Sequence, residues 1–152
     1  MVSQAELKPE ICTCLALRQA ARHVTQFYDQ FLAPVGLRVT QLSILAKLKG
    51  LGAMPVNALA RELVMDRTTL GRNMLPLARE GLIAIMPGST DRRSKELHLT
   101  SAGAARLKSA VKIWERAQAQ FATAFGSKRT VELRALLREI SVIELGAAPT
   151  DF

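Results

Sequence analysis

Residues 56–81 constrain the fold of this chain more than any other stretch. They read "VNALARELVMDRTTLGRNMLPLAREG" and predict two short helices joined by three or four residues. The first helix is entered near Pro55, which suits a proline because the first turn of a helix does not need its missing N–H. Asp66 is a candidate N-cap of the second helix, and Gly81 ends it. Two short helices in this order are what a helix-turn-helix requires.

The second of these helices has two chemically different faces. Leu70, Met74 and Leu77 fall within about 60° of one another, because each residue of a helix advances about 100°. We expect these three side chains to be buried. The polar side offers hydroxyl and guanidinium groups, which suit base edges in the major groove. The candidates for base contacts are Thr68, Thr69, Arg72 and Asn73, and those nearer phosphate are Arg67 and Arg79. The alternative is an ordinary amphipathic helix with a solvated polar face.

A basic loop between two apolar segments follows the helix-turn-helix. The segments "LIAIM" and "KELHL" predict an antiparallel hairpin, and the connection over residues 88–94 carries three charges and no large hydrophobic side chain. A hairpin in this place holds its tip beside DNA, where an arginine can enter a narrow minor groove. We favour Arg93 for that position, with Arg92 as the second choice and Lys95 as a further cation. Asp91 is expected to pair with one arginine and so orient the other; the alternative is a merely soluble turn.

The other segments predict helices. Their expected ranges are 11–32, 41–50, 102–125 and 128–145. Thr40 is the candidate N-cap of the second range, and Thr100 or Ser101 that of the third. Pro76 lies inside the helix that follows Asp66, and we expect that helix to tolerate it rather than use a kink to fit a groove. Because no linker or repeat divides the chain, we expect a single domain over residues 1–152 that is mainly α with a small β element.

The net charge is unusual for a chain of otherwise ordinary composition. Hydrophobic residues make up 49% and charged residues 22%, yet the formal charge is +8 and the isoelectric point is near 10.2. A charge of this sign favours a polyanionic partner, nucleic acid first and a membrane surface second. The basic residues are too dispersed for an interfacial helix, which argues against the membrane surface.

Several function classes lack their signatures in the sequence. No apolar run has the length of a transmembrane helix, and the N-terminus does not resemble a signal peptide. Cys12 and Cys14 are too close in sequence for a disulfide framework, so we expect a reducing, cytoplasmic setting. With His23 and His98 they offer too few ligands for a metal site. We find no phosphate loop and no paired carboxylates, and therefore expect neither an enzyme nor a cofactor.

Residues 37–103 resemble the MarR family of winged helix-turn-helix regulators. The matching stretches are "LRVTQLSIL", "NALARELVMDRTTLGRNMLPLAREGLI" and "STDRRSKELHLTSAG". The last contains the Asp-x-Arg wing of that family at Asp91 and Arg93, followed by its Leu-Thr-x-x-Gly helix start at Leu99, Thr100 and Gly103. The flanking helices agree in pattern, so the resemblance covers about 90% of the chain.

The resemblance implies an intertwined homodimer that binds a pseudo-palindromic operator, usually as a repressor. The DNA-binding lobe would cover residues 37–100, and the dimerisation helices residues 8–36 and 101–146. These helices have more apolar surface than one monomer needs. It comes from Val24, Phe27, Tyr28, Phe31, Val131, Leu133, Leu136, Leu137, Ile140 and Ile143. Two-fold symmetry would place the recognition helices about one DNA turn apart.

One residue departs from the family pattern. The turn between the two short helices often contains glycine in this family, but Val64 stands near that point. A β-branched residue disfavours positive φ, so we expect a turn of different shape.

Two kinds of signal are typical of regulators that resemble this chain. Some sense peroxides through a cysteine in the first helix, which makes Cys12 and Cys14 candidates, although either can be a small buried side chain. Others bind small aromatic anions between the dimer helices and the DNA-binding lobe. The candidates for such a site are Arg18, Arg22, His23, Tyr28 and Trp114. The alternative is that the aromatic residues belong to the core and the arginines are solvated.

The sequence therefore favours a sequence-specific, double-stranded-DNA-binding transcriptional regulator. We interpret it as a repressor relieved by a small molecule or by oxidation. The alternative is an architectural protein that binds DNA without regard to sequence, because a wing and a positive charge serve either function. Base discrimination separates the two.

Overall fold

The computed structural model describes residues 8–148, which form a mainly α-helical protein with a small sheet. The helices within these residues are α1 (Thr13–Leu32), α2 (Val39–Leu51), α3 (Val56–Glu62), α4 (Arg67–Arg79), α5 (Ser101–Phe125) and α6 (Ser127–Val142). The strands are β1 (Met54–Pro55), β2 (Ile83–Pro87) and β3 (Lys95–Leu99), and short 3-10 turns cover Pro9–Ile11 and Ala33–Val35. The expected fold class, six helices with a β-hairpin, is confirmed.

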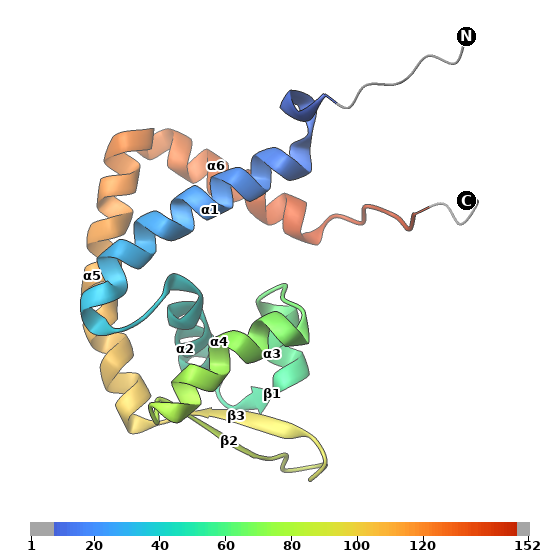
Figure 1. The fold of residues 1–152 in the computed structure, drawn as a ribbon, viewed down its shortest axis with the longest axis vertical. Coiled ribbons are helices and arrows are strands. Elements are labelled where there is room, and N and C mark those ends of the chain that lie inside the picture. The colour runs from blue at the N-terminus through green and yellow to red at the C-terminus, as the bar shows by residue number, and fades with distance from the viewer. Residues whose placement is uncertain (1–7, 149–152) are drawn as a thin grey trace.

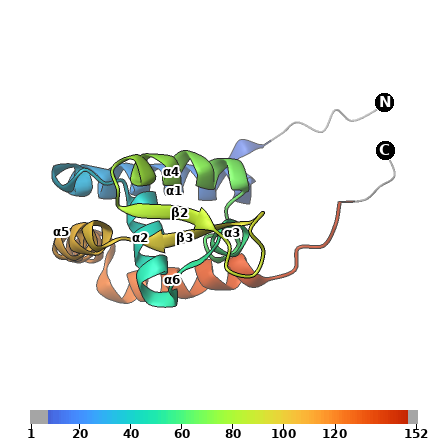
Figure 2. The ribbon, with the colours of Figure 1, turned by 90° about the horizontal axis from the view of Figure 1, so that it is seen from below.

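The helices α2, α3 and α4 and the three strands form one lobe, and α1 and α6 lie at the other end of the molecule (Figure 1). The long helix α5 runs along one side and connects the two ends. In Figure 1 α1 and α6 cross, whereas the view from below places them in separate layers (Figure 2). The helix α6 packs mainly against α5, whereas the C-terminal end of α1 also packs against the lobe through Leu32.

The core of the lobe is aliphatic. Its largest fully buried side chains are Leu32, Ile44, Leu45, Leu59, Leu70, Leu77 and Leu97. They come from α1, α2, α3, α4 and β3, so a single cluster holds the helix-turn-helix to the sheet and to α1. Burying each such side chain stabilises the fold by about 1.5–3 kcal/mol. The position of α4 is therefore set by packing under it, through Leu70, Met74 and Leu77, which are 0%, 9% and 1% exposed.

The sheet has one strand more than the predicted hairpin. The strands β2 and β3 pair antiparallel from Ile83 opposite Leu99 to Pro87 opposite Lys95. The two-residue strand β1 pairs with the other edge of β3, giving the order β1-β3-β2. A two-residue strand that contains Pro55 has no sequence signal, and proline is tolerated there because β1 is an edge strand.

The helix-start motif after the hairpin ties β3, α4 and α5 together. The Thr100 hydroxyl accepts a hydrogen bond from the Gly103 N–H at 3.0 Å and donates to the Gly81 carbonyl at 2.6 Å. Gly103 itself packs so closely that an added Cβ would lie 2.0 Å from the Leu82 carbonyl oxygen. Thr100 is thus the N-cap of α5, and glycine at residue 103 allows α5 to begin directly against the end of α4.

Several predicted helix ends are wrong by a few residues. Thr40 is not the N-cap of α2, which begins at Val39; there the Val39 N–H donates to the Asp29 carboxylate of α1 at 2.7 Å. A cap supplied from another helix leaves no local sequence pattern. The last helix ends at Val142 rather than at residue 145, because Ile143 is extended. The first begins at Thr13, with Cys12 as its N-cap, rather than at residue 11.

Two residues of the helix-turn-helix have unusual backbone demands. Pro76 lies within α4, which continues through it to Arg79. The expectation of an altered turn is wrong: Val64 adopts φ 51°, the left-handed conformation that a glycine would take. The bonds from the Val64 N–H to Arg61 (3.1 Å) and from the Met65 N–H to Ala60 (2.9 Å) hold the turn in that shape.

No single helix within residues 8–148 is long and apolar enough to cross a membrane. By length and composition alone, one pair of helical segments passes such a test: residues 13–35 and α2, which are bent by 72° relative to each other.

Candidate nucleic-acid interface

The helix α4 presents its polar side to solvent. Arg67, Thr68, Thr69, Arg72 and Arg79 are exposed, whereas Asn73 is partly buried. This side lies opposite the buried positions Leu70, Met74 and Leu77. Short, branched hydroxyl side chains stand at the first turn, and guanidinium groups stand at both ends and in the middle.

Asp66 caps α4 with both oxygens of its carboxylate. One oxygen accepts from the Thr69 backbone N–H at 2.8 Å, and the other accepts from the Thr69 hydroxyl at 2.6 Å. The hydroxyl bond and, after it, the backbone bonds lower the pKa of Asp66 below its ordinary value of 3.8. The predicted N-cap is confirmed, and Asp66 is a carboxylate at neutral pH.

Asn73 connects α4 to α2. Its amide oxygen accepts from the Thr40 hydroxyl at 2.8 Å, and its amide nitrogen donates to the Thr69 carbonyl at 2.8 Å. The amide is therefore held on both sides by the protein itself. Thr40, which the sequence suggested as a helix cap, instead orients a side chain 33 residues further along the chain. Nothing in a single sequence indicates such a pairing.

The loop between β2 and β3 is closed by its own backbone. The Arg93 N–H donates to the Asp91 carboxylate at 2.9 Å, and the Ser94 hydroxyl donates to the Asp91 carbonyl at 2.7 Å. The Gly88 N–H donates to the Ser94 carbonyl at 2.9 Å. The expected pairing of Asp91 with an arginine side chain is not among the ion pairs of residues 8–148. Asp91 bonds the backbone instead because an N–H two residues ahead is within reach of a short carboxylate.

Gly88 is required where this loop begins. It is buried, and an added Cβ would lie 2.2 Å from the Ser94 hydroxyl oxygen and 2.5 Å from the Asp91 carbonyl oxygen. Both distances are far inside van der Waals contact. The residues 88–94 therefore form a tight turn with Arg92 and Arg93 exposed at its tip.

A concavity of about 260 Å³ lies between the start of α4 and the hairpin. Three cations from different elements line it, Arg67, Arg93 and Lys95, together with Asn57 of α3. None of the three belongs to an ion pair among the described residues. Such a site favours an anion. The helix-turn-helix and the hairpin thus contribute to one basic surface.

The strand β3 carries a Glu96–His98 pair, whose two side chains point to the same face of the sheet because they are two residues apart. The His98 ring nitrogen Nε2 lies 3.0 Å from the Glu96 carboxylate. The other oxygen of that carboxylate accepts from the Ser89 hydroxyl at 3.4 Å. The arrangement links β3 to the first part of the loop.

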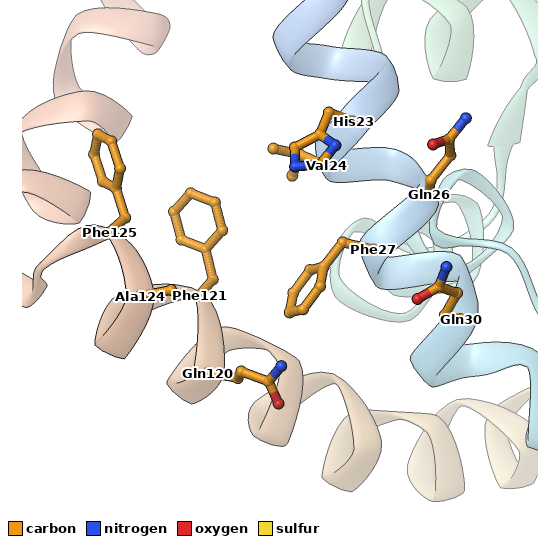
Figure 3. A pocket seen from close by; sticks show the side chains of 9 residues that line it. All are labelled: His23, Val24, Gln26, Phe27, Gln30, Gln120, Phe121, Ala124 and Phe125. Carbon is orange, nitrogen blue, oxygen red and sulfur yellow. The ribbon is translucent and has the colours of Figure 1, made fainter.

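The residues predicted for an effector site do not converge. His23 lines a cavity of about 430 Å³ between α1 and α5, where Phe27 and Phe121 project into the gap (Figure 3). Tyr28 lines a second cavity of about 530 Å³ between α1, α5 and α6, and its hydroxyl donates to the Gln118 side chain. Trp114 packs against the core of the lobe, and Arg18 and Arg22 are exposed on α1.

The second cavity has a mainly apolar wall with one cation, Arg134, which sequence reasoning missed because α6 reads as a dimerisation helix. Burial raises the pKa of Tyr28, and Arg134 opposes that rise.

The two cysteines lie at the start of α1, where the Cys12 sulfur accepts from the Leu15 N–H at 3.4 Å and Cys14 is exposed.

An exposed, capped helix beside a basic hairpin defines the winged helix-turn-helix class. The sequence profile of the MarR family matches residues 37–95. The chain is 34% identical to the transcriptional regulator MosR of M. tuberculosis, solved in complex with DNA, over 87% of this chain and 99% of that one, with a TM-score of 0.70. The chain belongs to the MarR family, whose solved relatives are transcriptional regulators.

Other solved structures share this fold. The transcriptional repressor CouR, bound to a 23-mer DNA duplex, is 27% identical over 90% of this chain and 99% of that one, with a TM-score of 0.77. A mutant MarR from E. coli, complexed with operator DNA, has the same fold at 18% identity, with coverages of 90% and 99% and a TM-score of 0.77. A comparison with curated protein sequences finds no match.

Proposed function

We propose that this protein is a homodimeric repressor that binds a pseudo-palindromic DNA operator and is released by a small-molecule or oxidative signal. The observation that carries the proposal is the shared basic surface, where Arg67 of α4 and Arg93 and Lys95 of the hairpin line one concavity. Phosphate contacts position a protein on DNA, and base contacts specify the site. MosR and CouR were solved in complex with DNA, which supports DNA binding by this relative of theirs.

The residues proposed to contact DNA have different roles. Thr68, Thr69 and Arg72 face the major groove, with Arg67 and Arg79 nearer phosphate. Arg93 enters the minor groove, or Arg92 in its place, and Lys95 binds phosphate. Asp91 shapes the loop from within, as its bonds to Arg93 and Ser94 support. Asn73 supports the helix through Thr40 rather than reading a base.

The dimer proposal rests on the exposed apolar side chains of α6. Leu136, Leu137 and Ile140 share one face of the helix and are 57%, 39% and 41% exposed, whereas Val131 and Val142, at 59% and 80%, lie on the opposite face. Apolar patches on a soluble domain mark interaction surfaces. A second copy of the chain covers the face of Leu136, Leu137 and Ile140, so that residues 37–100 form the DNA-binding lobe and residues 8–36 and 101–146 the dimerisation helices.

Selection of duplexes from a random DNA pool, at near-physiological salt, tests the function. Enrichment of an inverted repeat, bound by two protomers, is the expected result. Tight binding without an enriched sequence would instead establish the architectural alternative, since phosphate contacts alone give affinity without base preference.

The same selected duplex tests the two proposed signals. Mild peroxide is expected to release it if Cys12 or Cys14 is the sensor, and Cys12→Ser or Cys14→Ser should then abolish the release. Benzoate, as a simple aromatic anion, is expected to release it if the cavity beside Tyr28 and Arg134 is the effector site. Release of wild type but not of Arg134→Met would support that site, and equal release would exclude it.

A further inference from the structure

The two threonines of the first turn of α4 differ in how their hydroxyl protons are used. Thr69 donates its proton to Asp66 at 2.6 Å. A carboxylate has no proton to give, so the direction of this bond is fixed. Among the hydrogen bonds of residues 8–148, none involves the Thr68 hydroxyl. Thr69 therefore presents only oxygen lone pairs and a methyl group to solvent, whereas Thr68 remains free to donate or accept.

Base edges in the major groove differ in the same property. Adenine N6 and cytosine N4 are amino donors, whereas guanine O6 and N7 and thymine O4 are acceptors. Phosphate oxygens also only accept. A hydroxyl oxygen without an available proton can pair with an amino group but with neither a phosphate nor a carbonyl edge. Thr69 is exposed on the polar side of α4, where such an edge can approach it.

We propose that Thr69 is a specificity-determining residue that accepts a hydrogen bond from the amino group of adenine or cytosine, and that Asp66 is the positioning residue that fixes this polarity. The inference rests on the proposed DNA-binding function and adds the chemical class of the base. It also separates Thr69 from Asn73, whose amide is held by Thr40 and by the Thr69 carbonyl.

The structure supplies a substitution that reverses the polarity. In Asp66→Asn the amide oxygen can still accept a hydrogen bond from the Thr69 N–H. The amide nitrogen replaces the carboxylate oxygen that, in wild type, accepts the proton of the Thr69 hydroxyl. The nitrogen then donates to the Thr69 hydroxyl, whose own proton becomes free to donate to DNA. Asparagine is as good an N-cap as aspartate, so the helix is preserved.

The reversal predicts a particular base exchange. Adenine N6 and guanine O6 occupy the same position on the purine ring, and cytosine N4 and thymine O4 the same position on the pyrimidine ring. Asp66→Asn should therefore change adenine to guanine, or cytosine to thymine, at one position of each half-site. Other positions of the operator should keep their bases.

The test is selection from a random duplex pool with full-length wild type, Thr69→Val, Thr69→Ser and Asp66→Asn. Wild type and Thr69→Ser should prefer adenine or cytosine at one position of each half-site, and Thr69→Val should lose roughly 2- to 13-fold of discrimination there, the worth of one hydrogen bond. Thr123→Val is the matched control, because Thr123 is an exposed helical threonine on α5 whose hydroxyl bonds only its own helix. Melting temperature and dimer mass of every variant verify that it is folded.

The outcomes separate this inference from the proposed function. If wild type and Thr69→Val select the same inverted repeat, the role of Thr69 is overturned, whereas the proposed function as a DNA-binding regulator is retained. If the selected operator loses its base preference with Thr69→Val but keeps the wild-type base with Asp66→Asn, the role of Asp66 is overturned. No enriched sequence for wild type would overturn both the proposed function and the inference.

Discussion

Val64 holds a backbone conformation that β-branched residues rarely adopt. Its φ is 51°, and its side chain is 75% exposed, so burial of this side chain does little to offset the strain. The left-handed conformation costs an L-residue about 1–2 kcal/mol. The helix-turn-helix tolerates this cost because the flanking hydrogen bonds to Arg61 and Ala60 and the burial of Leu59 and Leu70 fix where both helices run.

Replacing Val64 with glycine should stabilise the protein. Relief of the left-handed strain exceeds the extra chain entropy of glycine, and we expect a gain of about 0.5–1 kcal/mol in the free energy of unfolding. Urea denaturation measures it. Val111→Gly, in the ordinary helix α5, is the control and should lose stability instead. An equal loss in both variants would show that Val64 is not strained.

Asp66 links stability to pH through its cap. Because hydrogen bonds from Thr69 lower the folded pKa below 3.8, the carboxylate contributes stability that is fully present above the unfolded pKa and is lost as pH falls through the folded pKa. The difference in melting temperature between wild type and Asp66→Ala should therefore shrink below about pH 4. Asparagine caps the helix but does not titrate. The difference in melting temperature between Asp66→Asn and Asp66→Ala should therefore stay constant with pH. A difference that stays constant with pH would contradict the assignment.

At the scale of elements, the hairpin carries two exposed arginines on a turn that is closed by its own hydrogen bonds. Its paired strands anchor it to β1 and to the lobe, and the turn over residues 88–94 is closed by bonds among Gly88, Asp91 and Ser94. A flexible loop would lose conformational entropy on binding DNA, whereas a closed turn has lost it on folding. Position rather than charge alone thus decides what Arg92 and Arg93 can reach.

Arg93→Ala should weaken operator binding about tenfold or more without unfolding the protein, because the side chain is exposed and its removal leaves no buried group unpaired. Fluorescence anisotropy with the selected duplex measures the affinity. Arg116→Ala on α5 removes the same charge away from the hairpin and controls for net charge. Equal affinities for wild type and Arg93→Ala at moderate salt would refute the wing assignment.

Gly88→Ala should weaken DNA binding without removing any charge. Its Cβ would overlap the Ser94 hydroxyl and the Asp91 carbonyl, so the turn must open and the arginines must move. We expect at least a several-fold weaker affinity with a small change in melting temperature, since the turn lies outside the core. Gly50→Ala, at a glycine with open space around it, is the matched control. Unchanged affinity would mean that the shape of the turn is not used.

At the scale of the whole molecule, α5 joins two parts with different surfaces. The lobe at one end has the concavity lined by Arg67, Arg93 and Lys95. The helix α6, which lies at the other end (Figure 1), has the exposed apolar side chains Leu136, Leu137 and Ile140 on one face. A lobe that reads half of a symmetric operator needs a partner at a fixed distance. The helix α5, which spans Ser101–Phe125, sets how far the lobe lies from α6 within one protomer.

The double variant Leu136→Glu, Ile140→Glu should convert the dimer to a monomer. The two side chains are one helical turn apart and 57% and 41% exposed, so charges there oppose association without filling the monomer core. Sedimentation velocity gives the mass. Leu51→Glu, at an equally exposed leucine of α2, should leave the dimer intact. A double variant that remains dimeric would place the interface elsewhere.

The sequence by itself determined the six helices, to within a few residues at their ends, the two strands of the hairpin, and the face that α4 buries. Periodicity predicted α4 and its buried Leu70, Met74 and Leu77, because this signal acts over a few residues. Local chemistry likewise predicted the cap at Asp66 and left Thr100 or Ser101 for α5, of which Thr100 is the cap. The motif that ends in Gly103 indicated the family for the same reason.

Tertiary structure decided every feature that depends on residues far apart in the chain. Asp29 caps α2, Thr40 holds Asn73, and β1 joins the sheet through β3, and no local pattern encodes these contacts. The candidate effector residues failed to converge because helical periodicity fixes a face but not the neighbour that it meets. Val64 shows the same limit: its intrinsic preference opposed the turn, and the packing of two helices against one core outweighed it.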